Sequence, residues 1–496
     1  VITAPSITLM SGGLNAASAM NTSSENYSWV VTNIGEGSLE NLVTSDALNY
    51  SGITTITGGT ANDTFNISNF THIPHVIDGG AGNDAVLSTQ TTAATISLNT
   101  ADAINADAKL ANIEQVTLAG TGNTLIADNL DNAWAIDAAD AGSVVYNGAE
   151  TTFTNIANLT GGNQQDTFTF AANGNISGVI DGGAQADDAQ ANGTEDSIAV
   201  NNSVAQVFVV NNTGATAGET GIKGIENIIA QAASNVTLVG DSSAANVWQL
   251  VDSGTHTLTQ NSSQVLTFAG IDTIVGGGAV SADTAATDTL NGANVDSTWT
   301  INAVNGGNVT STGTPISNLA FENMAQINGG NQVDTFDLSA TASVNGGVGN
   351  DIYNLLASGL SATITDADGS NDAGTDTLNS FDDASNTNIW VLGDTNTVTN
   401  SGGVVTFRGV ERLLGNDLAG AQTTDGANIS DTFTVDTAFT GEIISQGGND
   451  VITLNGSTKG GIAGSIIRVT AIGSAKYAVE GIVLASGTVV TPFADA

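Results

Sequence analysis

Aspartates that follow pairs of glycines are the residues of this chain with the clearest chemical potential. Two segments, Gly79-Gly-Ala-Gly-Asn-Asp84 and Gly346-Gly-Val-Gly-Asn-Asp351, share one pattern, and Tyr353 adds a large apolar residue just after the second aspartate. Glycine permits a tight corner because it has no Cβ, and Ca²⁺ prefers carboxylate and carbonyl oxygens in forgiving geometry. The two segments therefore predict corners that bind calcium.

In this pattern, G-G-x-G-x-D-x-U-x, the chain resembles the RTX nonapeptide repeats of secreted calcium-binding bacterial proteins. The resemblance implies that backbone carbonyls and the Asp carboxylate face the ion while the apolar residue fills the core. Members of that family carry nonapeptides in unbroken tandem, whereas the two copies here are isolated. The corners that begin at Gly58, Gly161 and Gly329 also lack the second glycine step. The looser pattern is similar to long repeat proteins of bacterial surfaces, such as adhesins, filament proteins and surface layers.

A second acidic feature recurs in loops that are rich in aspartate. It reads Thr194-Glu-Asp196, Thr287-Asp288 and Thr375-Asp376, each just before an apolar residue of an expected strand. Clustered aspartates can chelate Ca²⁺, and the alternative is an Asx turn, in which Asp hydrogen-bonds the nearby backbone. The candidate metal ligands are Asp63, Asp78, Asn83, Asp84, Asp166, Asp181, Asp187, Asp334, Asn350, Asp351, Asp366, Asp368, Asp431 and Asp450.

The charge of the chain also favours cations as partners. Seven Lys and Arg residues stand against 49 Asp and Glu residues, which gives a formal net charge of -42. Nucleic acid and anionic lipid both need a basic surface, so neither is an expected partner. Bound divalent ions would offset the repulsion between the acids, and Ca²⁺ is the expected cofactor. The acidic surface of a halophile is the alternative explanation for this charge.

The elements that must position these acids are internal repeats. The repeated motif reads aromatic or aliphatic, any, Gly or Asn, aliphatic, any two, aliphatic, and its copies begin at Tyr50, Leu110, Phe153, Ile222, Phe268, Phe321 and Phe407. Each of the five tryptophans lies upstream of a copy, which predicts a repeated core anchor. Gly58-Gly59 is followed 21 residues later by Gly79-Gly80, and Gly161-Gly162 is followed 21 residues later by Gly182-Gly183.

A step near 20 residues is about one coil of a β-solenoid, which we expect to hold three short strands and three corners. Segments such as Thr64-Phe-Asn-Ile and Thr335-Phe-Asp-Leu alternate as strands do. The sequence therefore predicts an all-β, parallel β-helix-like solenoid built from imperfect repeats. A string of small β-sandwich domains is the alternative, because it also gives short, regularly spaced strands.

We divide the chain into three parts. Residues 1–28 are expected to form an N-terminal strand segment that docks on a neighbour, and residues 29–455 form the body of β-repeats. Residues 456–496 are expected to form a C-terminal β cap or assembly segment. The chain begins at Val1 without Met or a leader, which indicates a processed product or a fragment.

Groups that could carry catalysis are sparse. The three histidines, His72, His75 and His256, are dispersed, cysteine is absent, and no G-x-S-x-G, H-E-x-x-H or P-loop motif occurs. We therefore expect a protein that is not an enzyme. A β-helical polysaccharide-degrading enzyme is an alternative, because hydrolases need only two carboxylates. No run approaches 18 apolar residues, so insertion in a membrane is not expected.

These observations predict an extracellular structural protein of a bacterial surface, stabilised by calcium. Exposed strand edges would let copies of the chain join head to tail into a filament, sheath or surface layer, including biofilm matrix. The second hypothesis is the stalk or a fragment of a large calcium-binding adhesin that contacts a cell-surface glycan.

Overall fold

The structure is a computed structural model that describes the chain in segments. These are residues 9–11, 19–21, 24–33, 36–53, 55–70, 76–100, 106–171, 173–183, 195–210, 219–231, 234–260, 263–277, 288–313, 316–366, 374–381, 386–415, 431–436, 441–444, 450–454, 466–473 and 476–482. All regular elements in these segments are β-strands. Within them there is no helix of the length and apolarity that a membrane span requires.

The chain forms two compact units, residues 1–244 with 255–277, and residues 245–254 with 278–496. In the first unit, one sheet contains β1 (Leu9–Ser11), β3 (Tyr27–Asn33), β4 (Glu36–Asn41), β5 (Ala47–Ser51), β7 (Thr64–Ile67), β9 (Ala85–Ser88), β12 (Gln115–Thr117), β14 (Asn132–Ala138), β15 (Ala141–Tyr146), β16 (Ala149–Thr154), β18 (Asp166–Phe170), β20 (Ser197–Val200), β23 (Asn227–Ala230), β26 (His256–Gln260) and β27 (Ser263–Ala269). The other contains β2 (Ala19–Asn21), β6 (Thr55–Thr57), β8 (Val76–Asp78), β10 (Thr95–Ser97), β11 (Ala108–Ala111), β13 (Thr124–Ile126), β17 (Asn158–Thr160), β19 (Val179–Asp181), β21 (Ala205–Val210), β22 (Thr220–Lys223), β24 (Asn235–Val239) and β28 (Thr273–Val275).

The second unit also has two sheets. One contains β25 (Asn246–Gln249), β29 (Thr289–Asn291), β33 (Gln326–Gly330), β35 (Ser343–Gly347), β37 (Ala362–Thr365), β39 (Ile389–Leu392), β40 (Asn396–Asn400), β41 (Gly403–Arg408), β43 (Thr432–Val435) and β45 (Val451–Leu454). The other contains β30 (Ser297–Ala303), β31 (Gly306–Ser311), β32 (Leu319–Glu322), β34 (Asp334–Leu338), β36 (Ile352–Leu355), β38 (Thr377–Asn379), β42 (Arg412–Leu414) and β44 (Glu442–Ile444). A separate hairpin joins β46 (Ile466–Gly473) to β47 (Lys476–Ile482).

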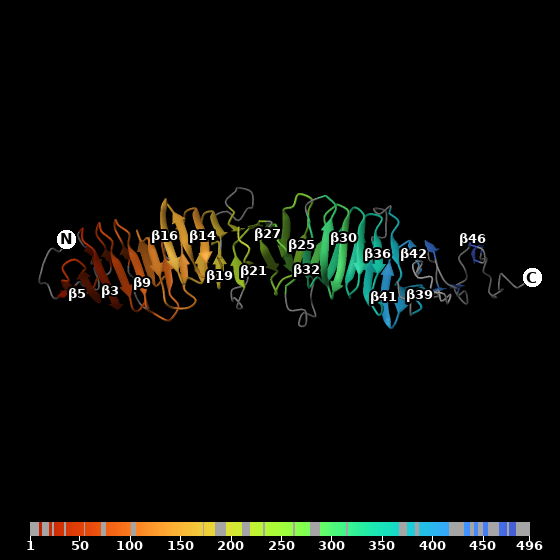
Figure 1. Cartoon of the computed structure of the whole chain (residues 1–496), viewed down its shortest axis with the longest axis horizontal. Helices are drawn as coiled ribbons and strands as arrows, with labels where there is room; N and C mark the ends of the chain where they lie inside the picture. Colours follow the sequence, from red (N-terminus) through yellow and green to blue (C-terminus); the bar gives the residue numbers. More distant parts are fainter. Residues whose placement is uncertain are drawn as a thin grey trace, which may run out of the picture. The chain divides into compact units, whose positions relative to one another are not determined.

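Within each unit the chain alternates between two mostly parallel sheets, which confirms the predicted all-β solenoid. In the first unit β6 pairs with β8 and β7 with β9, and both pairs align residues 21 positions apart, such as Thr64 with Ala85. The order of the strands follows the sequence from coil to coil, as the gradual colour change within each unit shows (Figure 1). Among its described residues such a coil has two strands, one in each sheet, and not the three that we expected, because residues 58–63 and 68–70 form no third strand.

Antiparallel insertions interrupt the parallel stacking and were not predicted. In the first unit β14, β15 and β16 form a meander, and β14 then pairs in parallel with β18 of the following coil. The same arrangement recurs in β3–β5, and in the second unit in β30–β32 and β39–β41. The first strand of each insertion carries a tryptophan.

These tryptophans anchor the core, as the sequence predicted. Trp134 is buried, stacks on Phe168 of β18 at 5.5 Å and meets the edge of Phe153 of β16 at 5.9 Å. The same three-ring contact recurs at Trp29, Trp299 and Trp390. The Tyr or Phe that opens the repeated motif is thus the edge partner of the tryptophan, which explains why the two share one register.

Replacing Trp134 with Ala removes a buried indole that two rings contact. We expect the free energy of local unfolding around β14 and β18 to fall by about 3–5 kcal/mol. Amide hydrogen exchange of β18 measures this loss. Val145→Ala on the exposed side of β15 is the matched control and should change the same value by less than about 0.5 kcal/mol. Equal effects of the two substitutions would contradict the anchoring role.

Candidate metal site

Buried carboxylates link successive coils where a strand begins. In the first unit the amide of Asp63 donates to Oδ1 of Asp84 at 2.7 Å, and the amide of Asp84 donates to Oε2 of Glu114 at 2.6 Å. Both aspartates are buried. Each carboxylate therefore satisfies a backbone N–H of the preceding coil, at the point where the corner interrupts the sheet hydrogen bonds.

The same ladder recurs further along both units. Each rung joins the amide of an acid to the carboxylate of the next: Asp166 to Asp196 and Asp196 to Glu226 in the first unit, and Asp334 to Asp351, Asp351 to Asp376 and Asp376 to Glu411 in the second. The amide of Asp431 likewise donates to Asp450. The three ladders that include a glutamate end on it. Glu114, Glu226 and Glu411 all belong to copies of the repeated motif, two residues before an apolar position, and we had not included them among the candidate ligands.

The corners before these acids are of two kinds. In the degenerate corners the amides of Gly59, Gly162 and Gly330 donate to Oδ2 of Asp63, Asp166 and Asp334 at 2.6–2.8 Å. In the second kind, Gly80, Gly183 and Gly347 have φ near +100°, at +95°, +107° and +103°. Their amides turn to the side chains of Asp78, Asp181 and Asn345, each at 3.1 Å. We call these closed and open corners. Only in a closed corner does the corner glycine itself hydrogen-bond the strand-start carboxylate.

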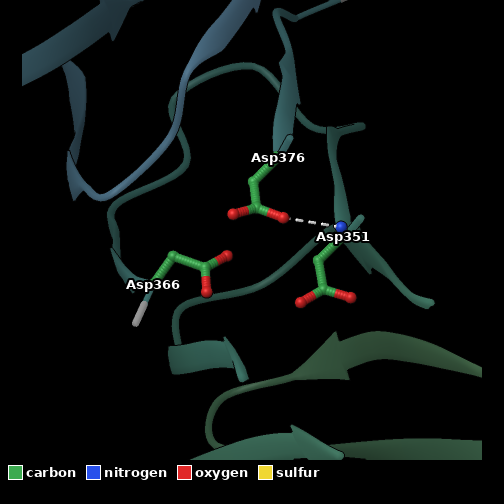
Figure 2. A group of neighbouring side chains, drawn as sticks. All are labelled: Asp351, Asp366 and Asp376. Carbon is green, nitrogen blue, oxygen red and sulfur yellow. Dashed lines mark hydrogen bonds between the residues drawn. The ribbon is translucent and has the colours of Figure 1, made fainter. Parts of the chain in front are cut away.

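Three buried aspartates converge beside one open corner in the second unit. Asp351 precedes β36, Asp376 precedes β38, and Asp366 follows β37. One carboxylate oxygen from each lies within 4.8 Å of the others, and Figure 2 shows the three groups facing a common space. This is the one such group of three or more His, Cys, Asp or Glu ligands in the part of the chain that the structure describes.

Tyr353 fixes one side of this triad. Its hydroxyl accepts the amide of Gly346 at 2.6 Å and donates to Oδ2 of Asp366 at 2.7 Å. Its ring stacks on Phe336, which in turn stacks on Trp299. Burial, together with the neighbouring Asp366 and Asp351 carboxylates, raises the pKa of Tyr353 well above its ordinary value, so the hydroxyl remains a donor.

The composition of the triad fits a hard cation. All three groups are carboxylates that are taken out of water, and each has two oxygens, so one hydrogen bond leaves further capacity for coordination. Carboxylates so close together in a medium of low dielectric require a counter-charge or protons. The site could therefore hold a metal ion, and oxygen-only ligands are those that hard divalent cations take.

The predicted ligands fall into several groups. Asp351 and Asp366 come together, and their partner Asp376 belongs to the second acidic feature. Asp63, Asp84, Asp166 and Asp334 are buried and Asp450 is half-buried, and all five accept backbone N–H groups of the ladders or corners. Asp431 is buried, and its amide donates to Asp450. Asp78 and Asp181 are half-buried at open corners, and Asn83 and Asn350 are exposed. Asp187 and Asp368 lie outside the described residues, as do His72 and His75. As cation ligands, the residues outside the triad stay a prediction.

No protein-family model matches this chain, and no curated protein is significantly similar to it.

Removing one carboxylate of the triad should remove most of the stabilisation of the protein by calcium. We expect that saturating Ca²⁺ raises the urea midpoint of the parent protein, and that Asp366→Asn loses most of this increase because the site loses a charge and a ligand. Asp137→Asn, at an exposed position of β14, is the control and should respond as the parent does. An Asp366→Asn variant that keeps the whole calcium response would rule out the triad as the site.

Burial raises the pKa of Asp84, Asp166 and Asp334 from 3.8 to about 6, so the folded chain binds protons more tightly than the unfolded chain. The stability from these groups is complete below pH about 4 and is lost as the pH rises through about 6. In chelator, the urea midpoint should therefore fall between pH 4.5 and 7. Asp166→Asn should make this decrease smaller, whereas Asp137→Asn should not. A midpoint that rises over this range would contradict the expectation.

Proposed function

We propose that this chain is an extracellular structural protein that assembles with copies of itself into a filament, sheath or surface layer, with calcium holding its acidic corners together. The observation that carries the proposal is the triad of Asp351, Asp366 and Asp376, three buried carboxylates at a corner of a repeating fold. A cation bound by these three side chains would act on the contacts between coils, because each aspartate belongs to a different rung or corner of the stack.

The hydrogen bonds of the triad support a stabilising role for the cation. Asp376 accepts the amide of Asp351, and Asp351 accepts the amide of Asp334, so the same side chains that face the site also join three successive coils. A cation that neutralises them would strengthen the coil contacts on both sides. In a repeat protein each coil contacts only its neighbours, and stability is the sum of such contacts.

The two-sheet coil supports a role in assembly. Parallel strands of a solenoid leave backbone N–H and C=O groups along any edge that no further coil covers, and such edges pair with strands of another chain. When one end of a copy binds the opposite end of the next copy, the contact is head to tail. If the copies continue in one direction, the chain of contacts does not close into a ring and forms a fibre. Residues 1–28 and 456–496 stay the segments that we expect to make these contacts. In the latter, β46 and β47 pair as a hairpin.

Sedimentation velocity tests the proposal directly. In millimolar Ca²⁺ we expect large species, and in excess EGTA we expect these to dissociate to a monomer, because the acidic coils then repel one another. Asp366→Asn should need more calcium to assemble, whereas Asp137→Asn should assemble as the parent does.

A monomer in both conditions would contradict assembly. If calcium still stabilised that monomer against urea, the adhesin stalk would become the better explanation. A monomer that calcium does not stabilise would contradict the calcium role as well.

A further inference from the structure

An asparagine that is followed by glycine is a chemically reactive pair, and the chain contains eight such pairs. Glycine has no side chain to shield its amide nitrogen, so this nitrogen can attack the side-chain carbonyl carbon of the preceding asparagine. Two pairs, at Asn192 and Asn455, lie outside the described residues. The environment of the glycine amide distinguishes the other six.

In five of these six pairs the glycine is buried. The five glycines are Gly174, Gly292, Gly306, Gly329 and Gly346. In three of them an acceptor holds the amide, such as the Tyr353 hydroxyl, which accepts the amide of Gly346 at 2.6 Å. The other two, Gly306 and Gly329, lie in strands β31 and β33. A buried amide within the sheets or corners can react only after the structure opens locally, and this opening costs free energy.

The sixth pair, Asn147 and Gly148, forms the turn between β15 and β16. Tyr146 pairs with Ala149, so these two residues alone make the turn, and their φ values of 47° and 77° are typical of a type I′ hairpin. Both residues are exposed, and a Cβ built on Gly148 would meet no atom within 4 Å. None of the described residues accepts a hydrogen bond from the Gly148 amide. This amide is therefore accessible without any opening of the sheet.

We propose that Asn147 is a site of spontaneous deamidation in the folded protein. The amide nitrogen of Gly148 bonds to Cγ of Asn147, the bond from Cγ to the side-chain nitrogen breaks, and this nitrogen leaves as ammonia with the proton of the Gly148 amide. The succinimide that forms takes up one water molecule at either of its carbonyl groups and gives aspartate or isoaspartate. The reaction needs water alone, and it depends neither on calcium nor on assembly.

Deamidation changes both the backbone and the charge of this turn. Isoaspartate adds one CH₂ group to the main chain, and a turn of two residues cannot absorb it while Tyr146 stays opposite Ala149. Either product also adds a negative charge close to the exposed Glu150. The affected strand, β15, pairs with β14 and β16 of the same meander. We therefore expect the change to loosen this meander.

The second unit contains a matched turn that lacks the amide side chain. Ser401 and Gly402 join β40 to β41 with φ values of 48° and 86°, and a Cβ built on Gly402 likewise meets no atom within 4 Å. The serine hydroxyl offers no carbonyl carbon for attack. Ser401→Asn therefore places the reactive side chain in a turn of the same geometry, and Asn147→Ser removes it from the first.

Peptide mass spectrometry of folded protein, kept in mildly alkaline buffer, tests the proposal. We expect conversion at Asn147 to be at least about tenfold faster than at the five asparagines whose glycine is buried, because these must wait for local opening. In the fast phase Asn147→Ser should release one equivalent of ammonia fewer than the parent protein, and Ser401→Asn one equivalent more. In concentrated urea the advantage of Asn147 should disappear, since every glycine amide is then exposed. Far-UV circular dichroism verifies that both variants are folded.

Equal rates at Asn147 and at the buried pairs of the folded protein would overturn the proposal. A folded Ser401→Asn variant that releases no additional ammonia would also overturn it, because the geometry of the turn would then not be sufficient. If Asn147 kept its advantage in urea, its neighbours in the sequence and not the turn would set the rate, and the inference would again be wrong.

Discussion

The structure depends on a hydrogen bond that a backbone amide at the start of one strand donates to a carboxylate one coil further on. A parallel sheet satisfies its own N–H groups within the strands, but the corner between two sheets leaves the first N–H of each strand without a sheet partner. Asp63, Asp166 and Asp334 solve this by donating to an acid of the next coil and presenting their own carboxylates in turn. Bonds to a charged acceptor are stronger than neutral ones, which fits their use at a buried corner.

This solution has a cost, because a buried carboxylate must itself be compensated. In closed corners the corner glycine supplies a second N–H to the same carboxylate, as Gly162 does for Asp166. In open corners the glycine adopts positive φ, and its N–H points to the side chain that precedes the glycine pair, as in Gly80 and Asp78. A φ near +100° is favourable for glycine, because it has no Cβ, whereas the non-glycine residues of positive φ in the described chain lie between 47° and 62°. The conformation of a single glycine therefore decides whether the carboxylate receives this hydrogen bond or depends on another source of positive charge.

Much of the fold could be predicted from the sequence, because the repeats have fixed spacing. The glycine pairs gave the 21-residue step that aligns Thr64 with Ala85, and the regular tryptophans indicated core anchors such as Trp134. The number of strands per coil could not be read in this way, since alternation of apolar residues locates strands but does not say which sheet they join. The antiparallel insertions were also missed, because their strands alternate just as the parallel ones do.

The candidate site could likewise be predicted only in part, because the sequence indicates which acids could be ligands but not which of them come together. Asp351 and Asp366 were predicted ligands because they lie in a glycine corner and an acidic loop, and both lie in the triad. Their meeting with Asp376 depends on the register of β36 with β38, which joins residues 25 positions apart instead of 21. A loop of variable length sets that register, and a constant period could not supply it. The terminal glutamates of the ladders were missed for a different reason, since Glu114 lies in the repeated motif, away from any glycine pair.

Compensation of charge has to be local in such a fold. Acids of one corner interact strongly through the low-dielectric core with those of adjacent coils, whereas charges several coils away are screened by salt. The net charge of -42 is therefore less informative than the charge of each corner. Closed corners use amides, and the corner of Asp181 uses Lys223. The chain has only seven basic side chains, too few to serve every group of buried acids. At the open corner of Asp84, Oδ1 receives the amide of Asp63 but Oδ2 has no hydrogen-bond partner, so the compensation of this carboxylate is less complete than in a closed corner.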